Sequence, residues 1–131
     1  MYIKSIEYTD YSGVTRKENF YFNFTKAELI EMDATEPGGL KQKLSDMVDL
    51  KDTVEIFKRM KQIVLSSYGK KSADGRTFEK SPELAKQFEQ SAAYSELIME
   101  FISNPDSFND FLRGIMPSVD TSKAVALPER N

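Results

Sequence analysis

The sequence predicts an α+β protein, mainly helical, in which an N-terminal antiparallel β-hairpin precedes about six short-to-medium helices. Three observations support this fold class. Aromatic and β-branched residues alternate with polar ones near the N-terminus, apolar residues recur at helical spacing later, and 131 residues is the length of one domain. We expect a globular domain over residues 1–116, with the hairpin in 1–24 and helices in 25–116, and a flexible tail over 117–131.

The expected hairpin has strands over residues 2–9 and 14–24, joined by a turn at 10–13 in which Gly13 can take a positive φ. Three phenylalanines of the second strand fall on one face by alternation: Phe20, Phe22 and Phe24. A two-stranded hairpin is marginal in water, so these rings need a helix or another chain against them. A core face is favoured over a base-stacking platform, because the neighbouring positions carry no basic residues suited to a nucleic-acid backbone.

The first helical segments are short. Thr25 and Glu28 fit a capping box, which predicts a helix from there to about residue 33. The proline and glycines of 34–39 end it. A second short helix is expected over 40–48, where Leu40, Leu44, Met47 and Val48 recur at helical spacing, and Asp52 is an N-cap candidate for the next.

The clearest helix is predicted over residues 53–67. Its apolar stripe comprises Ile56, Met60, Ile63 and Val64, widened by Val54, Phe57 and Leu65. Glu55 and Arg59 are spaced for an i,i+4 ion pair. Gly69 is expected to follow the helix as a C′ residue, with Lys70 and Lys71 beside the negative end of the helix dipole.

The remaining chain reads as a turn followed by three helical segments. Asp74 and Gly75 predict a tight turn, and Phe78 is expected to anchor this loop to the core. Ser81 and Pro82 form a helix start. Around Ser91 the helical pattern either continues or restarts, and a wide stripe then follows, made of Tyr94, Leu97, Ile98, Phe101 and Ile102. After the break at 104–106, a last stripe comprises Phe108, Phe111, Leu112 and Ile115.

Composition excludes several kinds of chemistry. The chain has no histidine and no cysteine, so structural zinc sites, thiolate nucleophiles and Ser-His-Asp mechanisms are unavailable. The Asp74-Gly75 pair lacks the other carboxylates of an EF-hand. We therefore assign no catalytic, cofactor-binding or metal-binding residues and expect no enzyme. A carboxylate- or lysine-based enzyme remains the most remote alternative.

Charge and hydropathy limit the partners. The net charge of −3 argues against a general nucleic-acid binder, although residues 51–80 hold eight basic and four acidic residues. A solvated helix face and loop explain this basic segment better than a phosphate-binding surface does. No apolar run approaches the roughly 18 residues that span a bilayer, so no membrane partner is expected.

Residues 63–102 resemble a known family. The motifs are Ser67-Tyr68-Gly69, a Lys-Ser-x-Asp-Gly-Arg-x-Phe run over 71–78, and Phe-x-x-Ser-x-Ala-Tyr-Ser-Glu-Leu over 88–97. A helix ending in Ile-Met-Pro at 115–117 follows. This order is similar to that of tail assembly chaperones from siphovirus-type phages and prophages.

The resemblance implies a non-enzymatic chaperone in the host bacterial cytoplasm. Such a protein binds the hydrophobic, helical tape measure protein, keeps it soluble and helps to recruit tail tube subunits. The expected partners are therefore the tape measure protein, the major tail tube protein and further copies of the chain. Candidate residues for partner binding or self-association are Phe20, Phe22, Phe24, Tyr94, Leu97, Ile98 and Phe101, each of which is also a core candidate. The structural signature loop comprises Tyr68, Gly69, Asp74, Gly75 and Phe78.

Two other functions stay open at this point. A different structural tail component, such as a tail-completion or connector subunit, would also lack catalytic residues. A small nucleic-acid-binding regulator could use the basic segment over 58–80 and would then bind DNA in a salt-sensitive way.

Overall fold

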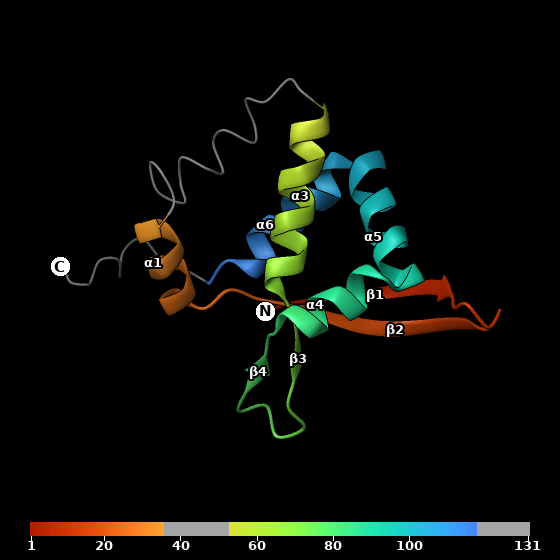
Figure 1. Ribbon diagram of the computed structural model, residues 1–131, viewed down its shortest axis with the longest axis horizontal. Helices are drawn as coiled ribbons and strands as arrows, with labels where there is room; N and C mark the ends of the chain where they lie inside the picture. Colours follow the sequence, from red (N-terminus) through yellow and green to blue (C-terminus); the bar gives the residue numbers. More distant parts are fainter. Residues whose placement is uncertain (36–52, 118–131) are drawn as a thin grey trace.

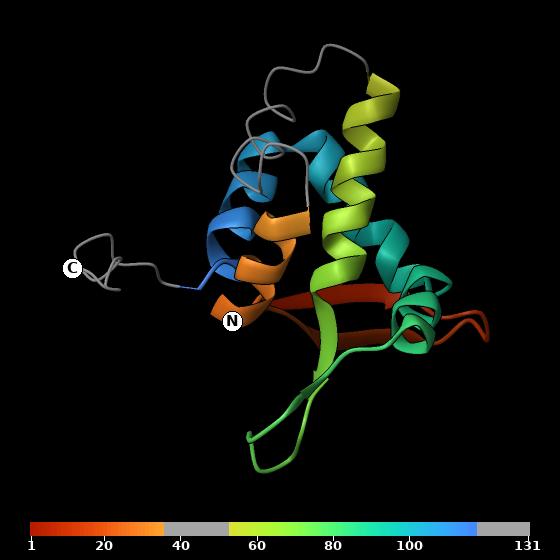
Figure 2. The same cartoon turned by 60° about the vertical axis from the view of Figure 1, so that its left-hand side comes forward.

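The computed structural model describes residues 1–35 and 53–117, which form one antiparallel sheet and five helices (Figure 1). The sheet order is β1-β2-β3-β4. The elements are β1 Tyr2–Thr9, β2 Thr15–Phe22, α1 Lys26–Thr35, α3 Thr53–Ser67, β3 Tyr68–Lys71, β4 Phe78–Glu79, α4 Pro82–Glu89, α5 Ala92–Ser103 and α6 Pro105–Ile115. In both views α3, α5 and α6 stand on one side of the β1–β2 pair, whereas β3 and β4 project to the other side (Figure 1, Figure 2). The predicted α+β class is confirmed.

The β1–β2 hairpin forms where the alternation predicts it. Tyr2 lies opposite Phe22 in the ladder, and Thr9 lies opposite Thr15. Asp10 closes the turn, because its carboxylate accepts hydrogen bonds from the amides of Ser12 and Val14, each at 2.9 Å. Gly13 has the predicted positive φ, at 84°.

The core lies between the inner face of the hairpin and the helices. Phe22 is fully buried, and its ring centroid lies 5.2 Å from that of Phe111 and 5.7 Å from that of Phe88. Aromatic pairs at these separations stabilise beyond their buried area, by roughly 0.5–1.5 kcal/mol each. The buried apolar residues come from every helix except α1: Met60, Ile63, Val64, Phe88, Ala93, Leu97, Ile98, Phe101, Phe108, Phe111 and Ile115, besides Ile6, Phe22 and Phe24 from the hairpin and its end.

Side-chain caps begin α1 and α4 where the sequence predicts, and a further cap at Ser91 decides that the helical pattern restarts there. The amide of Thr25 donates to the Glu28 carboxylate at 2.7 Å, and the Glu28 amide donates to the Thr25 hydroxyl at 3.1 Å, which completes the capping box before α1. The Ser81 hydroxyl caps α4 by accepting a hydrogen bond from the Leu84 amide at 3.1 Å. Ser91 caps α5, so the chain starts a new helix there.

The segment after α3 differs from the prediction. Tyr68–Lys71 forms strand β3 instead of a helix end, with Gly69 opposite Tyr21 of β2 and Lys71 opposite Phe78 of β4. Gly69 is therefore not a C′ residue, and Lys70 does not lie at the end of a helix dipole. At the junction of α3 with the sheet, the amide of Asn23 donates to the Ser67 carbonyl at 2.8 Å and so satisfies one of the carbonyls at the helix end.

Gly69 is required for space and not for a left-handed backbone. Among the described residues the glycines with positive φ are Gly13 and Gly75. A Cβ on Gly69 would lie 2.6 Å from the carbonyl oxygen of Glu79 and 2.7 Å from a ring carbon of Phe78. The predicted turn at Asp74-Gly75 is confirmed, with Gly75 at a φ of 78°, and it joins β3 to β4.

Several finer predictions need correction. Glu55 pairs with Lys58, at 3.7 Å, and not with Arg59. Ile30 of α1 is 71% exposed and Ile102 of α5 is 51% exposed, because each points away from the elements that its own helix covers. Val54 and Phe57, predicted to widen the stripe of α3, are exposed as well. The helix predicted over 40–48, the cap at Asp52 and the tail beyond residue 117 lie outside the described residues.

Candidate functional site

The predicted partner-binding residues lie in or against the core. Phe22, Phe24, Leu97, Ile98 and Phe101 are buried, and Phe20 and Tyr94 are half-buried. Both faces are part of one core cluster within the chain: Phe22 packs against Phe88 and Phe111, and the stripe of α5 packs toward β1 and α6, which is the core arrangement that the sequence left open. Their use as a partner surface stays a prediction, and it would require this core to open.

The signature loop contributes to an aromatic stack. The ring of Tyr68 is stacked on Phe88, with centroids 4.5 Å apart, and Tyr94 meets the same ring edge-on at 5.7 Å. Burial raises the pKa of the Tyr68 hydroxyl and of the Tyr94 hydroxyl. The structure thus brings together three aromatic residues of the resemblance motifs, and Gly69 and Phe78 lie against each other beside them.

Four basic residues of this segment pair with neighbouring carboxylates. Lys61 pairs with Glu89 at 2.6 Å, and Lys80 pairs with Glu28 at 2.7 Å. Lys58 and Arg76 also have acidic partners. Lys61 of α3 and Lys80, just after β4, thus join segments that are distant in the sequence, which favours a structural role for them over a phosphate-binding surface.

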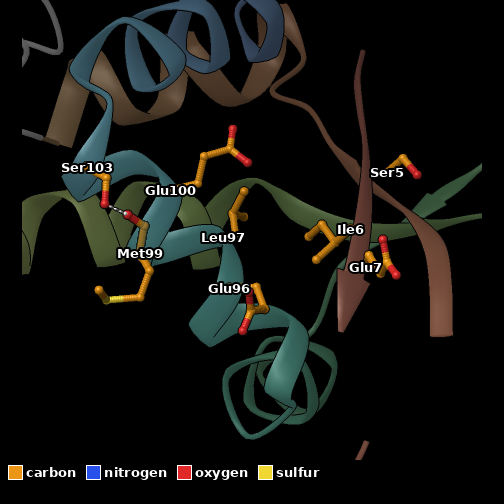
Figure 3. A pocket seen from close by; sticks show the side chains of 8 residues that line it. All are labelled: Ser5, Ile6, Glu7, Glu96, Leu97, Met99, Glu100 and Ser103. Carbon is orange, nitrogen blue, oxygen red and sulfur yellow. Dashed lines mark hydrogen bonds between the residues drawn. The ribbon is translucent and has the colours of Figure 1, made fainter. Parts of the chain in front are cut away.

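An accessible groove runs between the outer edge of β1 and helix α5. It has a volume of about 290 Å³ (Figure 3). Buried Ile6 and Leu97 lie at its base, and Met99 at its rim is 56% exposed. The full lining comprises Ser5, Ile6, Glu7, Glu96, Leu97, Met99, Glu100 and Ser103. Such a mixture of an apolar base with polar side chains suits the binding of a polypeptide segment.

The groove is acidic. Burial alone would raise the pKa of Glu100, but hydrogen bonds from the Lys4 ammonium and the Ser107 hydroxyl lower it below its usual value. Lys4 lies 2.6 Å from this carboxylate. Glu7 and Glu96 are exposed and have no ion pair among the described residues. Three carboxylates thus face one ammonium group, which leaves the groove negative.

Strand β1 presents free backbone groups to this groove. In the part of the chain that the structure describes, β1 pairs with β2 alone. The Asp10 amide donates to the Val14 carbonyl at 2.9 Å, so the hydrogen-bonded pairs of the ladder fall on the even residues of β1. The amides and carbonyls of Ser5 and Glu7 therefore point away from β2.

A second groove, of about 500 Å³, opens where β3 diverges from β2. The two strands pair only at Tyr21 with Gly69 and at Phe22 with Tyr68. The lining carries the opposite charge balance, with Lys70 and Lys71 on β3 and Glu18 on β2. Because the pairing stops at Tyr21, this second groove lies beside the residues of β2 before Tyr21, which have no partner on β3.

Sequence reasoning missed both grooves. Ser5, Glu7 and Glu96 read as ordinary solvent-facing positions, and nothing local distinguishes an edge strand from a central one. Within residues 1–35 and 53–117, no three acidic side chains come together to hold a metal ion. No helix in these ranges is long and apolar enough to cross a membrane.

The fold and its surfaces define an α+β domain whose accessible features are open strand edges flanked by charged side chains. The chain belongs to the phage tail assembly chaperone family, whose model matches residues 1–126. Comparison with curated proteins and with solved structures gave no match. Family membership assigns the chain a role in tail assembly and confirms the resemblance found in the sequence.

Proposed function

We propose that this protein binds the tape measure protein of its phage in the host bacterial cytoplasm. It keeps this long hydrophobic polypeptide soluble until tail tube subunits assemble around it, and it performs no catalysis. The observation that carries the proposal is the family match over residues 1–126. The open, charged strand edges support it, because they offer binding surfaces without unfolding the core.

Co-expression tests this function. The tape measure protein encoded with the chain is produced alone, with the chain, and with an unrelated acidic protein of similar size. The chaperone should raise the soluble fraction of the tape measure protein several-fold, and the unrelated protein should not. Equal solubility in all three conditions would contradict the proposal.

We further propose that the protein forms homo-oligomers and contacts the major tail tube protein when it recruits tube subunits. Exposed apolar side chains of the described residues, among them Ile3, Ile30 and Met99, supply area for such contacts. Sedimentation at increasing protein concentration should show species heavier than 15.0 kDa. A monomer at all concentrations would remove the oligomer from the proposal.

Finished particles distinguish a chaperone from a tail-completion or connector subunit. A chaperone acts during assembly and should be missing from purified virions, whereas a structural subunit co-purifies with them. Quantitative mass spectrometry of purified particles decides between these roles, and stoichiometric amounts of this chain would favour the structural role.

A further inference from the structure

We propose that the groove between β1 and α5 binds an extended, basic segment of the partner polypeptide as an added strand of the sheet. The identity of the partner rests on the proposed chaperone function. The position of the site, the extended conformation and the basic character follow from the groove itself.

The first support is the backbone of β1. This strand has eight residues, and the outward groups of Ser5 and Glu7 lie at the groove. An extended segment placed there continues the ladder with main-chain hydrogen bonds, which is the mode called β-augmentation. A helix satisfies its own backbone groups and could not use these donors and acceptors.

The second support is the position of α5. This helix packs on β1 and contributes Glu96, Met99 and Ser103 to the other wall of the groove (Figure 3). Every second side chain of an added strand would point toward this wall. Met99 offers an adaptable apolar contact for such a side chain, since methionine fits neighbours of varied shape.

The third support is charge. Glu7 and Glu96 lie on opposite walls and lack ion pairs among the described residues, while Glu100 is already held by Lys4. A lysine or arginine of the added strand can pair with either free carboxylate. Because both are exposed, the attraction should weaken as salt is added.

Lys4 accounts for the selectivity of this edge. It points to the inner face of an edge strand, where it pairs with Glu100 of α5. Inward-pointing charges on edge strands discourage indiscriminate strand pairing. The edge therefore stays open to a segment of matching charge while resisting unspecific aggregation.

The test uses the full chain, labelled with ¹⁵N, and overlapping 15-residue peptides from the tape measure protein encoded with it. We expect the bound peptides to be basic with alternating apolar residues, and to shift the amide signals of Ser5 and Glu7. Glu96→Lys should weaken binding at least tenfold at low salt. The control is Glu83→Lys on α4, an exposed glutamate outside the groove that changes the net charge equally.

A proline variant tests the backbone contact directly. Ser5→Pro removes an amide that faces away from β2, so the β1–β2 ladder keeps its hydrogen bonds while the added strand loses one. Ser5→Thr retains the amide and should bind like wild type. Equal binding by a folded Ser5→Pro variant, or by Glu96→Lys, would overturn the proposal.

Other occupants give different results. If circular dichroism shows that the bound peptides are helical, the groove binds a helix and the added strand is refuted. If the signals of Ser5 and Glu7 shift with protein concentration alone, the groove binds a second copy of the chain, which also refutes the added strand. If the wild-type chain solubilises the whole partner but binds no peptide in this groove, strand addition in the groove is refuted and the proposed chaperone function is unaffected.

If the wild-type chain does not solubilise the tape measure protein, the proposed function fails, and an eight-residue peptide of alternating lysine and valine then tests the groove alone. Preference for this peptide over its glutamate–valine counterpart at Ser5 and Glu7 supports the site, and no preference refutes it.

Discussion

Substitutions of Gly69 distinguish two explanations for a glycine after α3: a left-handed helix cap, or a lack of space for a side chain. If Gly69 capped α3 in a left-handed conformation, asparagine would be the best substitute, because it tolerates positive φ better than alanine. In the structure Gly69 lies in β3, and the space for a side chain is taken by the Glu79 carbonyl and the Phe78 ring. The larger asparagine should then be worse than alanine.

The magnitude follows from these contacts. A Cβ would lie 2.6 Å from a backbone oxygen, which cannot move without disturbing the β3–β4 pairing. Overpacking of this kind destabilises by roughly 1–3 kcal/mol. Losing glycine's freedom in the unfolded chain offsets about 0.4–1 kcal/mol of it. We expect a net loss for Gly69→Ala of roughly 1–2 kcal/mol, and a greater loss for Gly69→Asn.

Urea unfolding followed by circular dichroism measures the free energy of unfolding, and amide exchange at Lys71 and Glu79 shows whether the β3–β4 pair opens. Gly75 is the matched control, since its φ is 78° and no atom lies within 4 Å of its missing Cβ. There asparagine should be tolerated better than alanine. Equal stability of Gly69→Asn and Gly69→Ala would show that lack of space is not what requires a glycine at this position.

Gly114→Ala should destabilise by roughly 1–3 kcal/mol because its Cβ would meet the Tyr2 ring. Tyr2→Val removes the ring contacts with Phe111 and Phe22 and so lowers stability by itself, but in urea unfolding Gly114→Ala should cost much less in the Tyr2→Val background than in the wild type. Phe22→Ala should lower the free energy of unfolding by about 3–5 kcal/mol, since its ring is fully buried; a loss below 1 kcal/mol would contradict its central place. Because the folded pKa of Glu100 is lowered, its pair with Lys4 stabilises above the ordinary glutamate pKa and is lost as pH falls through the folded value. Lys4→Met should therefore weaken the acid dependence of the urea midpoint below about pH 4.5, and an unchanged profile would exclude this pair as its source.

Local signals could be read from the sequence because each depends on residues within a few positions of one another. Thr25 with Glu28 and Ser81 with Leu84 make their hydrogen bonds across three residues, so the helix starts were predictable. The Asp10 turn is equally local. The phenylalanine alternation also predicted a buried face, although not which helices cover it.

The β3 strand and the groove could not be read in this way. Tyr68–Lys71 has no alternating pattern of its own, and it becomes a strand because Gly69 and Tyr68 meet Tyr21 and Phe22 from a distant part of the chain. Tyr68 and Gly69 suit both the end of a helix and the start of a strand. Tertiary pairing decided between them.

The sequence by itself determined the α+β class, the helix starts, the absence of histidine and cysteine chemistry, and the resemblance to the tail assembly chaperones. These depend on residue types and short spacings, which exist before folding. Tertiary structure alone decided that the predicted binding residues lie in or against one core and that, among the described residues, β1 has an unpaired edge beside Glu96. Both depend on the order of strands in the sheet, which is set by contacts between distant residues and leaves no mark on any short stretch of sequence.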